Sequence, residues 1–440
     1  MWNADRSIGD RARARAAGPI VALAAWLAGG LTASAGYALT GLASFQGDNG
    51  ANSYAALVRD AAGNLYGTTS GGPVNSFGTI FEVVAGTSTP IVLAKFNGAN
   101  GANPFSELVV DAAGNLYGTT VFGGASGSGT VFELAAGSNT PTVLASFNGT
   151  NGANSYAGLV RDAAGNLFGT TSAGGANGFG TIFELAAGSS TPTALASFDG
   201  AHGNSSFAAL VRDAEGNLYG TTAFGGAKDL GTVFELAHGA STPTVLASFD
   251  RFHGNTPFAA LYRDAEGNLF GTTSAGGANG LGTIFMVSPG LNTPIFIASF
   301  DGANGRTPYT NLLADASGNL FGTTTGGGAN DRGTVFELAL GSDTPTTLFS
   351  FDFKNGAYPL SGLVMDPAGH LYGTTSNGGS LGVGTFYALS PSHGENLSVR
   401  PGYVVSPSAV PEPSAWLLLG IGGAALAGRS AWRKRAASAR

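Results

Sequence analysis

The sequence predicts an all-β fold, a seven-bladed β-propeller built from four-stranded antiparallel blades, and three observations lead to it. The tripeptide Gly-Thr-Thr occurs seven times, first at Gly67 and last at Gly373, and each copy follows the previous one by 51 residues. Each unit contains four short runs rich in β-branched and aromatic residues, separated by turn-forming residues. No stretch between residues 40 and 390 shows sustained helical periodicity. A fixed period of this length, held over seven units of four strands, is typical of a propeller.

One representative unit is expected to form strands at 158–162, 166–171, 180–185 and 192–198. The turn after its first strand reads Asp-Ala-Ala-Gly-Asn, from Asp162 to Asn166. The Asp carboxylate can accept backbone N–H groups of this turn, while Gly165 takes the left-handed conformation that a tight turn needs. Because the same Asp recurs in every unit we interpret it as structural; it stands at 60, 111, 162, 213, 264, 315 and 366.

The strands carry apolar residues at adjacent positions, as in Val131-Phe132 and Ile182-Phe183. This pattern is typical of a sheet that is buried on both faces, as each blade of a propeller is between its two neighbours. An open linear stack of the same units is the alternative architecture.

The ends of the repeat array favour a closed ring. Residues 41–45 read as a fourth strand without a blade of its own, while the seventh unit departs from the repeat pattern after its third strand. Placing 41–45 in the last blade completes the ring and removes exposed sheet edges. Residues 396–400 compete for that place because they fall in register with the missing strand. We favour 41–45 because its sequence matches the other six copies.

Charge and cysteine content exclude several classes of function. The chain has 20 Lys and Arg against 27 Asp and Glu, and nine of the basic residues lie before residue 20 or after residue 428. The part between them therefore carries a net charge of about −13, which repels nucleic acid and anionic polymers. The chain has no Cys, which excludes disulfides, thiolate metal sites and Cys nucleophiles. We expect no nucleic-acid partner, no metal and no cofactor.

The first 35 residues have the features of a secretory signal peptide. Four arginines, at positions 6, 11, 13 and 15, precede an apolar helix-forming stretch from Pro19 to about Ala33. The segment Ala33-Ser34-Ala35 then provides a cleavage site of the Ala-x-Ala kind. We predict a signal peptide at 1–35 and the propeller at 36–391.

The C-terminal segment predicts a second targeting signal. After a linker at 392–410, the motif Pro411-Glu412-Pro413 opens a segment that runs to residue 440. Its apolar stretch, 415–428, would span roughly 21 Å as a helix, which is short of a full membrane crossing but sufficient for a weak or temporary anchor. The basic cluster from Arg433 to Arg435 would stay on the cytoplasmic side and leave the propeller outside.

Two resemblances follow from these motifs. The tail resembles the PEP-CTERM sorting signal of Gram-negative bacteria, because the Pro411-Glu412-Pro413 motif, the hydrophobic segment and the Arg-rich end appear in order. That resemblance implies processing by a membrane-embedded exosortase and delivery to the cell surface or extracellular matrix. The repeats resemble the GloVer-type tandem repeat, as in the run from Leu116-Tyr117-Gly118 to Phe132-Glu133-Leu134. This second resemblance implies an exported, anchored protein and transfers no catalytic residue.

Candidate site residues are sought where the repeats differ. The loop after each fourth strand is expected to share one face with the loop between the second and third strands. On that face His202 and His253 occupy equivalent positions near Asp199, Asp250 and Arg251, a polar cluster that could hold a sugar or a cation. We expect no catalytic residue, since no His-Glu-x-x-His pair or P-loop occurs.

Two further sets of charged residues recur in the repeats. A partial ring of acids on the third strands comprises Glu82, Glu133, Glu184, Glu235 and Glu337. An Arg recurs one residue before the turn Asp, at 59, 161, 212 and 263. Pairing of these Arg and Glu residues across a blade is one interpretation, and a channel lined by catalytic carboxylates is the other.

The sequence thus predicts an exported, surface- or matrix-sorted, non-catalytic propeller that binds or organises extracellular material such as polysaccharide or protein. A secreted glycan-active hydrolase or lyase, with its site on the His202/His253 loops, is the alternative. A purely structural role is the third hypothesis. Expected partners are the sorting exosortase, the membrane through the C-terminal segment, and a polysaccharide or matrix protein.

Overall fold

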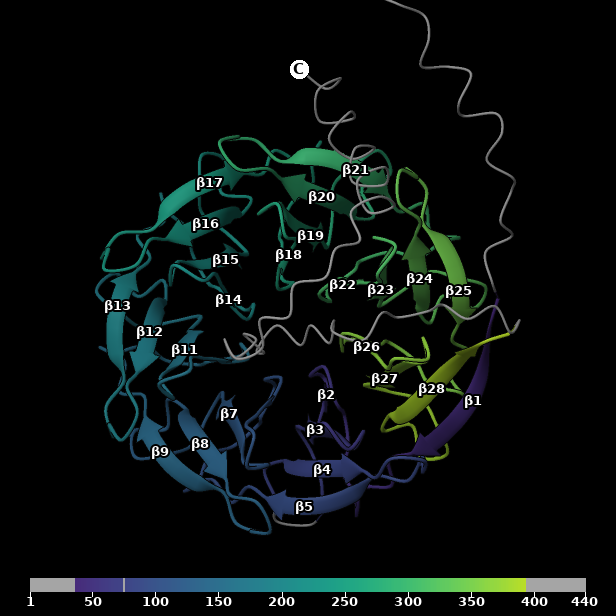
Figure 1. The fold of residues 1–440 in the computed structure, drawn as a ribbon, viewed down its shortest axis with the longest axis horizontal. Helices are drawn as coiled ribbons and strands as arrows, with labels where there is room; N and C mark the ends of the chain where they lie inside the picture. Colours follow the sequence, from purple (N-terminus) through teal and green to yellow (C-terminus); the bar gives the residue numbers. More distant parts are fainter. Residues whose placement is uncertain (1–35, 74–75, 393–440) are drawn as a thin grey trace, which may run out of the picture. The chain divides into compact units, whose positions relative to one another are not determined.

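The computed structural model describes residues 36–73 and 76–392, and this part of the chain forms a seven-bladed β-propeller (Figure 1). The predicted signal helix, the linker beyond residue 392, the competing strand 396–400 and the C-terminal helix lie outside the described residues. Within the described ranges no helix is long and apolar enough to cross a membrane.

Each blade is a four-stranded antiparallel sheet, and in six of the seven blades the strands follow the chain from the propeller axis outwards (Figure 1). The first, innermost strands have two residues each: β2 (Val58–Arg59), β6 (Val109–Val110), β10 (Val160–Arg161), β14 (Val211–Arg212), β18 (Tyr262–Arg263), β22 (Leu313–Ala314) and β26 (Val364–Met365). The second strands contain Gly-Thr-Thr: β3 (Leu65–Thr69), β7 (Leu116–Thr120), β11 (Leu167–Thr170), β15 (Leu218–Thr222), β19 (Leu269–Thr273), β23 (Leu320–Thr324) and β27 (Leu371–Thr375).

The third and fourth strands complete the blades. The third strands are β4 (Thr79–Val83), β8 (Thr130–Leu134), β12 (Thr181–Leu185), β16 (Thr232–Leu236), β20 (Thr283–Val287), β24 (Thr334–Leu338) and β28 (Thr385–Pro391). The outermost strands are β5 (Ile91–Lys95), β9 (Thr142–Ser146), β13 (Thr193–Ser197), β17 (Thr244–Ser248), β21 (Ile295–Ser299), β25 (Thr346–Ser350) and β1 (Tyr37–Ser44). The observed strands are shorter than the predicted runs. The difference is largest for the innermost strands, because hydrogen bonds within the following turn begin after two residues of strand pairing.

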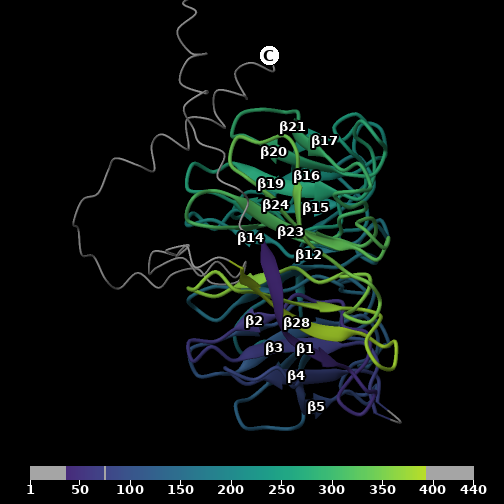
Figure 2. The same ribbon diagram turned by 90° about the vertical axis from the view of Figure 1, so that its right-hand side faces the viewer.

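The ring is closed by the N-terminal strand, as predicted. Strand β1 pairs antiparallel with β28, from Tyr37 opposite Pro391 to Ser44 opposite Thr385, and it lies against β28 on the rim (Figure 2). The strand begins four residues earlier than the predicted start at Gly41, because β28 extends to Pro391 and provides partners for Tyr37 to Leu39. The N-terminal strand therefore supplies the outer strand of the seventh blade.

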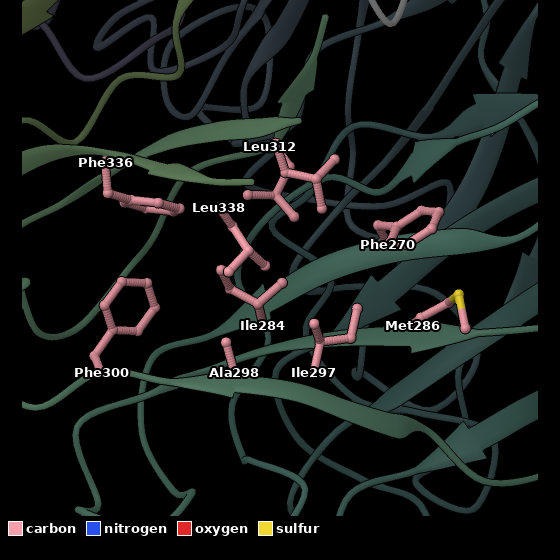
Figure 3. Packing of buried hydrophobic residues seen from close by; sticks show 10 residues of the cluster. Phe270, Ile284, Met286, Ile297, Ala298, Phe300, Leu312, Phe336 and Leu338 are labelled. Atoms are coloured by element: carbon pink, nitrogen blue, oxygen red, sulfur yellow. The ribbon is translucent and has the colours of Figure 1, made fainter. Parts of the chain in front are cut away.

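The core consists of apolar layers between neighbouring blades. Between blades 5 and 6, Ile284 and Phe300 of one blade face Leu312, Phe336 and Leu338 of the next, all buried (Figure 3). The Phe that ends each fourth strand contacts the aromatic ring of the third strand in the next blade edge-on, as Phe300 and Phe336 do with centroids 5.1 Å apart. Such a contact adds about 0.5–1.5 kcal/mol beyond area burial. The two-sided apolar strands are thus explained by burial on both faces.

The Gly-Thr-Thr tripeptide serves this packing. Gly118 lies opposite Phe132, and a Cβ at Gly118 would lie 2.7 Å from the Phe ring. The next residue, Thr119, donates its hydroxyl to the Ala157 carbonyl of the following blade at 3.0 Å. The second threonine, Thr120, shares a hydrogen bond with Thr130 of the third strand at 2.9 Å. One residue makes room for the core, one joins two blades and one joins two strands.

Candidate ligand-binding face

Two faces of the propeller differ in construction. The loop face consists of the segments between second and third strands and the segments that lead from one blade to the next. These segments meet, since the Gly124 N–H donates to the Gly98 carbonyl at 2.9 Å. The turn face consists of the Asp-x-x-Gly-Asn turns and the turns between third and fourth strands. The shared loop face was predicted from the strand order.

The turn face is held by an internal polar network. The Asp111 carboxylate accepts the backbone N–H of Asn115 at 2.9 Å, as predicted, and also the Tyr117 hydroxyl at 3.1 Å. Tyr117 donates to Glu133 as well, at 3.0 Å. Burial opposes ionisation of Asp111, but these hydrogen bonds outweigh it and lower its pKa.

The recurring Arg and Glu residues belong to the same face. The Glu residues lie on the third strands, away from the axis, where Tyr117 binds Glu133. The Arg161 guanidinium lies over the Tyr117 ring of the preceding blade, 5.6 Å from its centroid. Arg212 and Arg263 stack on the preceding blade in the same way. The third-strand carboxylates therefore do not line the axis, and stacking between blades accounts for the position of these Arg side chains.

The predicted site residues lie on the loop face in two adjacent loops. Asp199 accepts the His202 backbone N–H at 2.8 Å through one carboxylate oxygen and contacts His202 Nδ1 at 2.8 Å through the other. The hydrogen bond from the His202 backbone leads the interactions that lower the pKa of Asp199. In the loop one blade earlier, Asn148 accepts the Asn151 backbone N–H at 3.1 Å. The Asp–His pair thus closes the turn that an Asn–Asn pair closes elsewhere.

The second pair repeats this geometry with an added cation. Asp250 contacts His253 Nδ1 at 2.8 Å, and Lys228 Nζ lies 3.8 Å from its other oxygen. Desolvation opposes ionisation of Asp250, but the bonds from His253 outweigh it and lower the pKa. Arg251 has a positive φ of 68° and its carbonyl accepts the Gly277 N–H at 2.8 Å. Across residues 36–73 and 76–392, no group of three or more His, Asp and Glu side chains is placed to hold a metal ion.

Exposed apolar side chains concentrate on the loop face. Among the described residues ten large apolar side chains are exposed, and seven of them lie in loop-face segments: Phe77, Phe122, Phe179, Phe224, Phe252, Phe353 and Leu381. Phe252 is 66% exposed and stands beside His253, with ring centroids 5.1 Å apart. This enrichment distinguishes the loop face from the rest of the described surface, where single exposed apolar residues are ordinary.

A ring of aromatic residues, which the sequence reasoning missed, surrounds the axis where the chain descends from the loop face to the innermost strands. We name it the aromatic collar; its members are Tyr54, Phe105, Tyr156, Phe207, Phe258 and Tyr309. Successive rings from Tyr54 to Tyr309 contact one another across the blade boundaries, with centroids 4.8–5.5 Å apart. All six are only partly buried, and Leu360 takes the seventh position. Their common spacing of 51 residues is the signal that could have identified them.

Two residues further along the chain lies a second set, the axial layer: Ala56, Glu107, Gly158, Ala209, Ala260, Asn311 and Gly362. Its members meet across blade boundaries, since a Cβ at Gly158 would lie 3.3 Å from Glu107 Cβ and 3.4 Å from Ala209 Cβ. The Glu107 side chain is partly buried, and desolvation raises its pKa to about 8. Perturbed acids of this kind are frequent at functional sites.

Solved structures confirm the fold class without showing an activity. The extracellular domain described as that of a hybrid two-component system from B. thetaiotaomicron aligns with a TM-score of 0.53 at 10% identity, covering 81% of this chain and 39% of that one. The extracellular domain described as that of a one-component system from the same organism aligns with a TM-score of 0.52 at 11% identity, covering 81% of this chain and 40% of that one. The chain thus spans about two fifths of the length of these chains. No curated protein matches it.

Sequence families place the chain more closely. The Gloeobacter/Verrucomicrobia repeat matches residues 31–234 and 206–403 as two tandem copies, and the PEP-CTERM protein-sorting motif matches residues 409–435. The second match confirms the PEP-CTERM resemblance of the C-terminal segment, which marks an exported protein that an exosortase handles at the membrane of a Gram-negative bacterium. The seven blades, the 51-residue period and the profile match agree: the chain belongs to the Gloeobacter/Verrucomicrobia repeat family and carries a C-terminal PEP-CTERM sorting motif.

Proposed function

We propose that this protein is a non-catalytic binding propeller that is sorted to the cell surface or extracellular matrix, where its loop face binds extracellular polysaccharide or protein. The observation that carries the proposal is the concentration of exposed apolar side chains on that face. An apolar surface rimmed by polar residues is typical of an interaction site.

The path of the chain supports this orientation. Strand β28 runs from the loop face to the turn face and ends at Pro391, and the Ser392 N–H donates to the Gly36 carbonyl at 2.6 Å. Both ends of the propeller therefore leave from the turn face. An anchor attached through the C-terminal segment would hold the turn face near the membrane and leave the loop face available to partners.

The Asp–His pairs support binding rather than hydrolysis. Each carboxylate is engaged by the backbone and ring of its own histidine, in a turn that other blades build from Asn. General acid–base hydrolysis of a glycan uses two carboxyl groups in different environments that face one bond. The two Asp residues lie in separate loops, and each is bound to its own histidine.

A pull-down with the purified exported protein tests the proposal. The test variant combines Phe122→Ala, Phe224→Ala and Phe252→Ala, because equivalent positions in other blades already carry Ala, at 173, 275, 201 and 303. The matched control is Ile91→Thr, which removes an exposed apolar side chain from an outer strand and introduces the residue found at 142, 193 and 244. We expect the triple variant to lose capture of envelope polysaccharide or protein while the control retains it. Equal capture by the triple variant, or turnover of a captured glycan, would contradict the proposal.

A further inference from the structure

We propose that the aromatic collar and the axial layer together form a binding site for one uncharged saccharide unit, such as the end of a neutral glycan chain. The inference rests on the proposed function and assigns it a ligand class and a place. In this site the collar rings contact the faces of the sugar, and Glu107 and Asn311 bind its hydroxyl groups.

The collar has the dimensions of a site for a single ring-sized group. Interplanar angles between successive rings are 39–59°, close to the rotation of about 51° that relates neighbours in a sevenfold propeller. For seven equivalent positions, the observed centroid spacing places each ring roughly 6 Å from the axis. Because every collar residue is partly exposed, solvent reaches the rings. Aromatic rings that remain in contact with water at a converging position are typical of a ligand site.

The polar groups of the two layers suit hydroxyl groups. The collar contains three phenol groups, from Tyr54, Tyr156 and Tyr309, and the axial layer contains the Glu107 carboxyl and the Asn311 amide. The Asn311 side chain extends towards the neighbouring blade, since its Oδ1 lies 1.9 Å from the position that a Cβ on Gly362 would take. Phenol, carboxyl and amide groups both donate and accept hydrogen bonds, which is what a sugar hydroxyl requires. The other five axial positions are Ala or Gly and carry no polar side-chain group.

Charge selects an uncharged ligand. The propeller body carries a net charge of about −13 and repels anionic polymers. Neither layer contains Lys or Arg, so that no cation is present to bind a sugar acid. Glu107 is the single acid in either layer, and its pKa of about 8 keeps the carboxyl protonated at neutral pH. A protonated carboxyl offers hydrogen bonds to a hydroxyl group and no counter-charge to a cationic ligand.

Titration of the purified protein with neutral oligosaccharides tests the assignment. An array of uncharged glucans, mannans and galactans identifies the probe, and calorimetry gives its Kd. The collar variant combines Phe207→Leu and Phe258→Leu, since the chain itself uses Leu360 at this position, so that apolar volume is kept while two ring faces are lost. We expect Kd to rise at least tenfold. A second variant, Asn311→Gly, introduces the residue that the axial layer already has at positions 158 and 362. It is expected to weaken binding by several fold.

The control is Ile91→Thr, which changes an exposed residue of an outer strand, leaves both layers unchanged and is expected to bind the oligosaccharide as the wild type does. Unchanged Kd values in both the collar variant and Asn311→Gly would overturn the inference. Binding of tetramethylammonium in place of any neutral sugar would overturn it in favour of a cation site. If no neutral sugar binds while the triple variant still loses envelope capture, the inference is wrong and the proposed function stands. If the wild type captures nothing, the proposed function itself is wrong.

Discussion

The Thr374 hydroxyl donates a hydrogen bond of 2.9 Å to the Ser53 hydroxyl, and in doing so joins the last blade to the first. The backbone repeats the relationship, since the Asn52 N–H donates to the Val383 carbonyl at 2.8 Å, just as the Asn103 N–H donates to Phe77 between blades 1 and 2. The junction of residues more than 300 positions apart is thus built like the junction of sequential blades. The ring closes without a distinct joint.

Loss of the closing strand should destabilise the whole ring. Deletion of residues 36–44 removes β1 and exposes the long edge of β28, which carries unpaired backbone groups. We expect a lower melting temperature and concentration-dependent association, measured by calorimetry and size-exclusion chromatography. Deletion of residues 411–440, the sorting segment, is the control and should leave the melting temperature unchanged. A 36–44 deletion that melts like the wild type would show that closure contributes little.

Gly118→Ala should destabilise the second blade. The added Cβ would lie 2.7 Å from Phe132 Cζ and 3.0 Å from Leu108 Cδ2, both within the buried core. Overpacking of this kind costs about 1–3 kcal/mol, which urea unfolding can measure. The control is Gly137→Asn, at a turn with φ of 76° and no atom within 4 Å of the new Cβ, where Asn is tolerated. Equal stability of the two variants would contradict the steric role of the Gly-Thr-Thr glycine.

Glu107→Gln should stabilise the protein at alkaline pH. The folded-state pKa of Glu107 is raised to about 8 by desolvation, so its contribution to stability is fully present below its unfolded pKa and is lost as pH rises through 8. The axial layer contains no other ionisable side chain. We expect the Gln variant to gain about 2 kcal/mol over the wild type at pH 9, an amount reduced by partial solvent access, and little at pH 4.

Thermal unfolding from pH 4 to pH 9 checks this expectation, with the exposed Glu215→Gln as control. The wild type and the control should lose stability together across this range, while Glu107→Gln declines less. Parallel curves for all three proteins would exclude a buried acid at position 107.

His202→Asn should leave the fold and any binding activity intact. Asn151 and Asn304 occupy equivalent positions and close the same turn with their backbone N–H groups. Asp199→Ala should instead cost about 1 kcal/mol, because it leaves the His202 N–H without its carboxylate partner. Thermal melting and glycan binding measure both effects. A large loss of binding in His202→Asn, with an unchanged melting temperature, would assign the histidine a direct part in ligand recognition.

Much of the fold could be predicted from local patterns. The seven copies of the 51-residue repeat predicted the number of blades. The Asp-x-x-Gly-Asn turns could be predicted because an Asp and an Asn four residues apart interact within one turn. The match of residues 41–45 to other fourth strands identified the closing strand, although its start at Tyr37 depended on the length of β28. These features follow from hydrogen bonds between residues close in sequence or from a repeated pairing.

Two sites show where such reasoning stops. His202 and His253 were predicted to form one polar cluster because they differ from the residues at equivalent positions, yet each lies in its own Asp-closed turn. Tyr54 and Phe105 were not predicted to meet, yet their ring centroids lie 4.8 Å apart. A residue that departs from the repeat is easily found in the sequence, but the departure does not show which side chains it contacts.

The sequence by itself determined the repeat, the strand order within a blade, the identity of the closing strand and the sorting motif. Only the tertiary structure decided which side chains meet, as Phe207 and Phe258 do across a blade boundary with centroids 5.3 Å apart. The physical reason is rotation about the axis. Rotation brings residues 51 positions apart into contact near the axis and separates them at the rim. The distance of a residue from the axis therefore decides whether such residues meet, and no local sequence pattern gives that distance.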